Sequence, residues 1–437
     1  MIKYLEIYTK RLSVLSQKPS KCETPDTFVC EDYEEEEPQL CELDSSKTYK
    51  GLIGIYVDDS LITFIDGTHG KLYYRGYSLE DLVNNSTFEE VAYLLIYGRL
   101  PSKSQFNSFK DQLIKERNVP DNILTILKSF PRNTTRIELL RTSVSALSLY
   151  DEDDYDFSEE ANIRKGIRII AKIPTVLAFS HRIQTNLPLV EPSEELSHAG
   201  NYYYMMTERE PSKEFETAFD KILICHADHS INSSTFSCRV TVSTLSDIYS
   251  GITSAIGTLR GPLHGGANER VMRMMVEEIK KKENIIPFVK RKLENKEKIM
   301  GFGHRVYKTW DPRARILREL SKNFWEKWKK GEIIDKIPDP VYDIDHGEID
   351  TIFEMTEILA DYMIKTKNIY PNVDLYSAGL LHILGIPTPL FTPLFAASRS
   401  AGWVAHAIEQ LSDNKLIRPR LRYIGELDKN YKKIDER

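Results

Sequence analysis

The sequence predicts an all-α fold with a minor β element near the N-terminus. Beyond residue 86, apolar residues recur at helical spacing along almost the whole chain. Two stretches, 240–256 and 375–394, carry few charges, which is typical of helices buried by their neighbours or by another subunit. Before them, the runs 51–57 and 61–67 are rich in β-forming residues and end at turn residues, so they predict a small local sheet.

The first helix has clear start and stop signals. Ser86 and Thr87 precede Phe88 and two acidic residues, which predicts an N-cap with acids in the first turn. Gly98 and Pro101 predict its end. Further helices are predicted near 104–117, 136–149, 162–184, 214–228, 243–256, 266–282, 312–328, 350–367 and 396–411. No fixed-period repeat is found, so a solenoid is not expected.

Composition narrows the function classes. The chain has 437 residues, about three domains at roughly 150 residues each, with 59 Lys and Arg against 65 Asp and Glu. This near balance argues against a general nucleic-acid binder. No apolar run approaches the ~18 residues of a membrane-spanning helix. We therefore expect a soluble, multi-lobed globular protein, most simply an enzyme, with no nucleic-acid or membrane partner.

The acidity is concentrated near the N-terminus. Residues 1–21 carry a formal charge of +4 and residues 22–47 carry −9, so only −1 of the total −6 belongs to residues 48–437. Segment 1–21 has the character of either a transit peptide, which would place the protein in the mitochondrial matrix, or a peripheral helix of a cytoplasmic protein, which we favour. Segment 22–47 is expected to be an acidic linker.

Cysteine usage agrees with a cytoplasmic location. The five cysteines are too few and too scattered for a disulfide framework, which favours a reducing compartment. None has the short spacing of a zinc knuckle or the flanks of a nucleophile, so all five are interpreted as structural. They are Cys22, Cys30, Cys41, Cys225 and Cys238.

Three strings rich in histidine and glycine carry the chemistry. They are 226–232 (HADHSIN), 261–269 (GPLHGGANE) and 301–308 (GFGHRVYK). A lone buried histidine is more often a hydrogen-bonded core residue than a catalyst. His264 and His304 stand among glycines, which let a ligand approach the backbone, and this favours a functional role.

A metal site is the competing interpretation. His226 and His229 have i, i+3 spacing, and His264, His304 and Asp374 could complete a ligand set. Neither an H-E-x-x-H motif nor a cysteine pair accompanies them, so no metal is expected. The nucleotide-binding patterns G-x-G-x-x-G and G-x-x-x-x-G-K-[ST] are also missing.

Basic residues recur around the strings. Arg305, Lys308 and Arg313 follow the third string, and Arg399 and Arg418 flank an apolar helix. Guanidinium groups match carboxylates in two-pronged geometry, so such a set suits a small polycarboxylate.

Between Lys50 and Gly425 the chain resembles the citrate synthase family. Each matching string is moderate support by itself, but six or more in family order are highly specific. The strings are 65–67, 74–77, 88–95, 226–232, 261–267, 301–307, 311–313 and 372–376.

The resemblance implies condensation of oxaloacetate with acetyl-CoA, through an enol, to citrate and CoA. It makes Asp374 the base that takes the methyl proton. His264 would donate a hydrogen bond to the thioester oxygen, and His304 would polarise the ketone and protonate the alkoxide. A helix N-terminus close to His264 would keep that side chain neutral.

The resemblance also implies the binding residues and the assembly. Acetyl-CoA is a co-substrate, and no permanently bound cofactor is expected. A homodimer is implied, because Arg418 would reach the neighbouring subunit's site. Oxaloacetate would be held by His229, Arg313, Arg399 and Arg418, and CoA by Ile299, Met300, Gly301, Phe302, Gly303, Arg305 and Lys308. The expected parts are an N-terminal extension (1–47), a large helical domain (48–265 with 377–437) and a small helical domain (266–376).

Two alternative functions stay open, a related enzymatic reaction and a non-catalytic role. A 2-methylcitrate synthase shares the same strings and uses propionyl-CoA, and one methyl group is worth only ~1–3 kcal/mol of discrimination. A non-catalytic, assembly-forming homologue would keep the fold, although intact His264, His304 and Asp374 argue against it.

Overall fold

The computed structural model describes residues 48–52, 54–153, 155–332 and 346–437. The extension 1–47, with Cys22, Cys30 and Cys41, lies outside the described residues. The chain forms two units, residues 60–416 and residues 1–59 with 417–437, and each is treated by itself. No described helix is both long and apolar enough to cross a bilayer.

The unit of residues 60–416 begins with a three-stranded antiparallel sheet. Strand β1 (Thr63–Asp66) pairs with β2 (Lys71–Tyr74), which pairs with β3 (Tyr77–Ser78). The predicted strand at 61–67 is thus confirmed. The predicted strand at 51–57 is wrong: Lys50–Leu52 form the short 3₁₀ helix η1, and Gly51 and Gly54 adopt positive φ angles that an extended strand does not allow.

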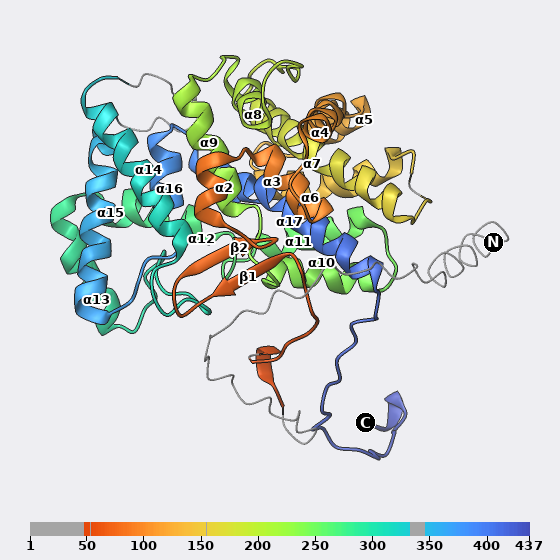
Figure 1. The fold of residues 1–437 in the computed structure, drawn as a ribbon. Helices are drawn as coiled ribbons and strands as arrows, with labels where there is room; N and C mark the ends of the chain where they lie inside the picture. The colour runs from red at the N-terminus through yellow and green to blue at the C-terminus, as the bar shows by residue number, and fades with distance from the viewer. Residues whose placement is uncertain (1–47, 53, 154, 333–345) are drawn as a thin grey trace, which may run out of the picture. The chain divides into compact units, whose positions relative to one another are not determined.

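Helices make up most of the remaining described chain (Figure 1), and the all-α prediction is confirmed. The helix predicted from Thr87 to Gly98 is present, with Thr87 accepting a hydrogen bond from Glu90 N. The helices are α2 (Leu79–Asn85), α3 (Phe88–Tyr97), α4 (Lys103–Lys115), α5 (Asp121–Ser129), α6 (Arg136–Leu147), α7 (Glu159–Gln184), α8 (His198–Thr207), α9 (Lys213–His226), α10 (Ser233–Ser243), α11 (Ile248–Leu259), α12 (Ala267–Arg273), α13 (Ile285–Glu294), α14 (Pro312–Lys329), α15 (His346–Lys367), α16 (Val373–Ile383) and α17 (Phe391–Ser412). Short 3₁₀ or π segments are η2 (Ser148–Tyr150), η3 (Met274–Ile279), η4 (Lys282–Asn284), η5 (Thr388–Leu390) and η6 (Ile434–Glu436).

Two apolar stretches are broken where the sequence analysis expected continuity. The predicted helix 243–256 spans the gap between α10 and α11, where Leu245 has a positive φ and Asp247 caps α11. Gly385, with φ 76°, separates α16 from α17. The predicted helix 266–282 ends as the π-helix η3.

Helix α17 is the centre of the large core. It packs against α3, α7, α9, α10 and α11, and nearly every side chain from Phe391 to Ile408 is buried. Glycines permit the closest contacts. A Cβ on Gly166 of α7 would lie 2.3 Å from Val404, and one on Gly402 would lie 2.4 Å from the Ala227 carbonyl. The first contact packs α7 against α17, and the second packs α17 against the 226–232 string. On one side of Figure 1, α13 to α16 pack against one another.

We predict that Gly402→Ala lowers the free energy of unfolding by about 1–3 kcal/mol, because the new methyl group overlaps backbone and carboxylate atoms that cannot retreat. Gly379→Ala in α16 is the matched control, since its Cβ would meet Thr356 Oγ1 at an ordinary 3.5 Å. This control should be neutral or stabilising by about 0.5–1 kcal/mol. Urea unfolding of both variants measures the difference, and equal stabilities would contradict the close packing of α17.

Candidate active site

The predicted oxaloacetate residues converge on one small cavity of about 130 Å³. Its walls come from the loop after α9, the turn before α12, the loop before α14, and helices α14, α16 and α17. This brings six of the seven predicted catalytic and oxaloacetate-binding residues together. The lining residues are His229, Asn232, His264, Gly265, His304, Arg313, Asn372, Val373, Asp374, Phe395 and Arg399. Arg418 belongs to the other unit and is exposed.

Two buried guanidinium groups give the cavity its affinity for anions. Arg313, 3% exposed, makes a two-pronged ion pair with Asp311, at 3.0 Å through Nε and 2.7 Å through Nη2. Arg399, 1% exposed, donates from Nε to the His226 carbonyl and has no described hydrogen-bond partner at Nη2. Burial lowers the pKa of Arg399 to about 10, so it still carries a charge at neutral pH. An anion in the cavity would satisfy the unpartnered Nη2.

His304 is held as a neutral imidazole with a defined tautomer. Its Nδ1 accepts hydrogen bonds from the backbone N–H groups of Val306, at 3.0 Å, and Tyr307, at 3.2 Å. Burial, helped by the charge of Arg313, lowers the pKa of His304 to about 4. A neutral imidazole that accepts at Nδ1 carries its proton on Nε2, so the ring can donate a hydrogen bond from Nε2.

His264 is neutral for a similar reason. Its Nε2 lies 2.8 Å from Ser234 Oγ and 3.3 Å from the Ser234 backbone N–H, and Trp403 Nε1 donates to the same hydroxyl. A ring that accepts this N–H at Nε2 carries its proton on Nδ1. Burial and the charge of Arg399 lower the pKa of His264 to about 4. Burial is the larger of these two causes of the lowered pKa, and α12 begins only at Ala267.

The pKa of Asp374 is shifted in the opposite direction to the pKa values of the two histidines. Burial raises its pKa to about 7, against the attraction of Arg313 and with the repulsion of Asp311. The residue lies in the first turn of α16, where Asn372 accepts from the Asp374 N–H at 3.0 Å. Asn372 also bonds Gly301 and Gly303, so the carboxylate is tied to the loop that carries His304.

Four further residues line the small cavity or contact its histidines and were not predicted from the sequence: Asn232, Asn372, Ser234 and Tyr307. Asn232 and Asn372 stand inside the quoted strings, and their roles as helix N-caps were readable from those positions. Tyr307, 5% exposed, places its hydroxyl 3.2 Å from His229 Nε2. This contact joins residues 78 positions apart and has no local signal.

A larger cavity, of about 990 Å³, adjoins the small one. Four residues line both: His264, His304, Asn372 and Asp374. Of the predicted CoA residues, 299–303 and Arg305 line the larger cavity. Lys308 does not line it, and the Lys308 backbone N–H is bonded to the Gly67 carbonyl in the β1–β2 turn. The cavity instead contains four cations that were not predicted: Arg270, Arg273, Lys292 and Lys298.

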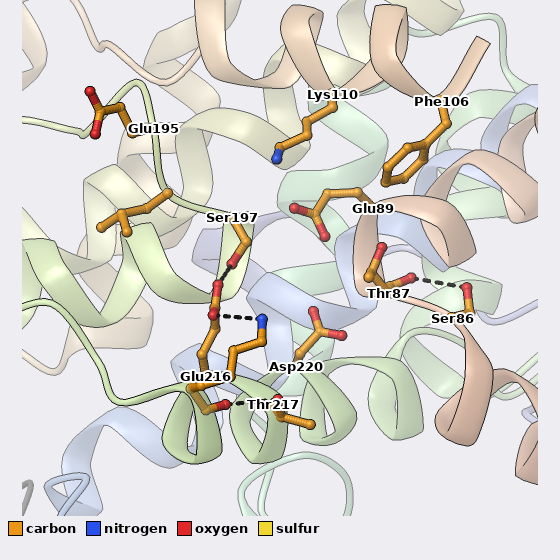
Figure 2. Close-up of a pocket in the computed structure, with 12 residues that line it drawn as sticks. Ser86, Thr87, Glu89, Phe106, Lys110, Glu195, Ser197, Glu216, Thr217 and Asp220 are labelled. Carbon is orange, nitrogen blue, oxygen red and sulfur yellow. Dashed lines mark hydrogen bonds and ion pairs between the residues drawn. The ribbon is translucent and has the colours of Figure 1, made fainter. Parts of the chain in front are cut away.

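A separate cavity of about 420 Å³ shares no lining residue with these two. Figure 2 shows Glu89, Glu216 and Asp220 turned toward its interior. Asp220 accepts from the Phe88 N–H at the start of α3, and Glu89 accepts from the His198 N–H at the start of α8. Burial and the neighbouring Glu89 raise the pKa of Asp220. Asp220 and Glu89 therefore cap helices, and Glu216 accepts from the Ser197 hydroxyl and pairs with Lys213. These bonds explain the position of all three carboxylates without a ligand.

The other potential ligand sets are also structural. Within the described residues, no group of three or more His, Cys, Asp and Glu side chains is placed to hold a metal ion. Cys225 and Cys238 are buried free thiols whose pKa values burial raises.

Comparison with known proteins agrees with this geometry. Residues 51–420 match the family model "Citrate synthase, C-terminal domain". The chain belongs to the citrate synthase family. It is an enzyme of the acyltransferase class and has citrate synthase activity. The comparisons do not favour the 2-methylcitrate alternative. The predicted family, fold and activity are confirmed.

Several relatives cover nearly all of the family region. A citrate synthase of Haloferax volcanii is 42% identical over 90% of this chain and 100% of its own length. Citrate synthase 2 of Bacillus subtilis is 45% identical over 89% of this chain and 99% of its own. A "Citrate/2-methylcitrate synthase" of Bacillus subtilis is 37% identical over 86% and 96%.

Solved structures of the family match as well. The ternary complex of a Thermoplasma acidophilum citrate synthase with carboxymethyl coenzyme A and oxaloacetate has a TM-score of 0.82 and 32% identity. It covers 90% of this chain and 100% of that chain. The Thermotoga maritima citrate synthase has a TM-score of 0.77 and 40% identity, over 90% of this chain and 99% of that chain.

We predict that His264 and His304 do not take up a proton between pH 6 and pH 8, since both pKa values lie near 4. Ring ¹⁵N chemical shifts measure this, with His264→Asn and His304→Asn variants to assign the signals. His304 should show the pattern of a neutral ring protonated at Nε2. A titration of either ring with a midpoint near the ordinary value of about 6.5 would contradict the buried site.

Proposed function

We propose that Asp374, His264 and His304 carry out the condensation of oxaloacetate with acetyl-CoA, with Asp374 as base and the two histidines as hydrogen-bond donors. The observation that carries this proposal is the position of all three at the junction of the small and large cavities. A four-carbon dicarboxylate suits the 130 Å³ cavity, and the far larger CoA suits the 990 Å³ one. The reacting carbons would then meet between these three side chains.

Enolisation uses the opposite pKa shifts of Asp374 and His264. A thioester methyl group is a weak acid, so the base must be ionised and poorly solvated, and the developing charge on oxygen must be stabilised. The Asp374 carboxylate takes a methyl proton. The Nδ1–H of neutral His264 donates a hydrogen bond to the thioester oxygen and stabilises the enolate charge that develops on it.

Carbon–carbon bond formation uses His304. Its Nε2–H donates to the oxaloacetate ketone oxygen and makes the ketone carbon more electrophilic. The enolate carbon attacks this carbon as the thioester C=O re-forms, the ketone π electrons move to oxygen, and the alkoxide takes the Nε2 proton of His304. The proton held by Asp374 is released through solvent, from which His304 regains its Nε2–H. Water then cleaves the thioester of citryl-CoA to give citrate and CoA.

Oxaloacetate would be held by charge and hydrogen bonding within the small cavity. Arg313 and Arg399 bind the carboxylates, and His229 orients the substrate from the opposite loop. In the proposed homodimer, Arg418 of each chain completes the neighbouring subunit's site. The Thermoplasma acidophilum complex with oxaloacetate and a CoA analogue supports this choice of ligands.

CoA would lie along loop 299–303, and the ion pairs indicate which cations meet its phosphates. Arg273 is paired with Glu269 and Glu277, and Lys292 with Glu278 and Glu297. Arg270, Lys298 and Arg305 line the same cavity with no salt bridge to a described residue. We assign binding of the CoA phosphates to these three residues and not to Lys308.

The proposed large lobe consists of residues 48–265 and 377–437, and the proposed small lobe consists of residues 266–376. The boundary between 376 and 377 lies inside α16. Closure of the small lobe would exclude water during enolisation. Acetyl-CoA acts as a co-substrate and no permanently bound cofactor is required by this chemistry. We place the enzyme in the cytoplasm.

We predict that Asp374→Ala abolishes CoA thiol release from acetyl-CoA and oxaloacetate, because no other described carboxylate lines both cavities. The thiol is measured with a chromogenic disulfide, and the thermal unfolding temperature shows that the variant is folded. Unchanged turnover in the folded variant would exclude Asp374 as the base.

We also predict that kcat/KM of the unmodified enzyme decreases as the pH falls through about 7. Only the ionised carboxylate accepts a proton, and the raised pKa means that Asp374 is protonated below about pH 7 instead of below about pH 4. A pH profile of kcat/KM from pH 5 to 9 measures this. A flat profile down to pH 5 would contradict the buried base.

We predict that kcat/KM is higher with acetyl-CoA than with propionyl-CoA at saturating oxaloacetate. The extra methyl group must fit a junction that His264, His304 and Asp374 already narrow, and one methyl group is worth ~1–3 kcal/mol, or roughly 10- to 200-fold. Parallel kinetics with the two acyl-CoAs decide this. A preference for propionyl-CoA would assign the 2-methylcitrate reaction, and no turnover with either would favour the non-catalytic homologue.

A further inference from the structure

The β1–β2 hairpin contacts two of the three segments that bring a histidine to the small cavity, those of His229 and His304. At its base, Thr63 Oγ1 donates to Asp228 Oδ2 at 2.5 Å. On the paired strand, Tyr74 donates its hydroxyl proton toward the carbonyls of Ile224 and Asp228, at 3.2 and 2.9 Å. Asp228 is fully buried and directly precedes His229. The base of the hairpin therefore holds the backbone that carries His229.

The tip of the hairpin lies against the loop that carries His304. Lys308 N donates to the Gly67 carbonyl at 2.9 Å. A Cβ on Gly67 would lie 2.5 Å from the Val306 carbonyl oxygen, and a Cβ on Gly70 would lie 2.6 Å from the Trp310 carbonyl oxygen. The two backbones approach so closely that only glycine fits at both positions of the turn.

The loop held by this tip determines the orientation of His304. The backbone N–H groups of Val306 and Tyr307 are the ones that bond His304 Nδ1. The Tyr307 hydroxyl lies 3.2 Å from His229 Nε2, and the rings of His229 and His304 are 5.1 Å apart between centroids. A shift of the 306–310 backbone would therefore move both rings.

We propose that the β1–β2 hairpin is a positioning element that sets the spacing between His229 and His304, with Thr63 at one end and Gly70 at the other. In Figure 1 the hairpin is seen as two adjacent strands below α2. None of its residues lines the small cavity, so it acts through the two loops and not on the substrate. This inference rests on the proposed roles of His229 and His304.

Gly70→Ala tests the tip, with Gly76→Ala as its matched control. Both glycines have positive φ angles, 66° and 85°, so alanine is strained to a similar degree at each. Only Gly70 abuts the loop, since a Cβ on Gly76 would meet no atom within 4 Å. We expect Gly70→Ala to stay folded but to unfold at a lower temperature than Gly76→Ala, because its methyl group meets the Trp310 carbonyl. At a temperature where both variants are fully folded, we expect kcat of Gly70→Ala to be roughly 10- to 100-fold lower than that of Gly76→Ala.

Thr63→Val tests the base, with Thr63→Ser as the conservative rescue. Valine keeps the shape of threonine but cannot donate to Asp228, whereas serine retains the hydroxyl. We expect Thr63→Val to weaken the binding of oxaloacetate alone by about tenfold, the usual effect of losing one hydrogen bond to a charged group. Calorimetry measures this Kd without acetyl-CoA, and Thr63→Ser should restore it.

Equal kcat and oxaloacetate Kd in Gly70→Ala and Gly76→Ala would overturn the positioning role. So would a Thr63→Val enzyme that binds oxaloacetate normally, or one that Thr63→Ser fails to rescue. Failure of the proposed function gives a different result, because the unmodified enzyme would then release no CoA thiol from acetyl-CoA and oxaloacetate.

Discussion

Partial burial of three titratable side chains at the junction of the two cavities is the constraint on which the rest of the site depends. Burial penalises whichever form of a side chain is charged, so it raises the pKa of a carboxyl group and lowers that of an imidazole. Here it brings Asp374 to about 7 and both His264 and His304 to about 4. At neutral pH one environment thus provides an ionisable base of useful strength beside two neutral donors. Enolisation followed by attack on a ketone requires this combination.

Buried charge is costly, and the fold offsets the cost locally. Arg313 makes a two-pronged ion pair with Asp311. Arg399 donates to a backbone carbonyl, and its Cζ lies 4.7 Å from the centroid of the Phe395 ring. The unpartnered Nη2 of Arg399 is the exception, and Arg399 lines the cavity where a substrate carboxylate is proposed to bind. Helix α17 carries this arginine, and Gly402 lets the helix pack directly against the 226–232 string.

Local sequence signals predicted the parts of the site but not how they face one another. Glycines around His264 and His304 marked ligand-facing turns, and Gly301 and Gly303 do adopt positive φ angles. Lys308 does not line the larger cavity, and its contact with Gly67 joins residues far apart in the sequence, so the motif gave no sign of it. The pairs of Arg273 with Glu269 and Glu277 have i, i+4 spacing and were readable from the sequence, whereas the pair of Lys292 with Glu278 joins α13 to η3 and has no such signal. The prediction of a strand at 51–57 was wrong because it rested on the β-forming side chains, whereas Gly51 and Gly54 adopt positive φ angles that an extended strand does not allow.

The most direct measurement is a crystal structure of the protein with oxaloacetate and an unreactive acetyl-CoA analogue. We expect the oxaloacetate carboxylates to bond Arg313 and Arg399, the ketone oxygen to lie within hydrogen-bonding distance of His304 Nε2, and the analogue's acyl group to lie between Asp374 and His264. Arg418 of the partner chain should complete the site. Oxaloacetate bound elsewhere, or an acyl group beyond reach of the Asp374 carboxylate, would contradict the central claim that the junction of the two cavities is where the reaction occurs.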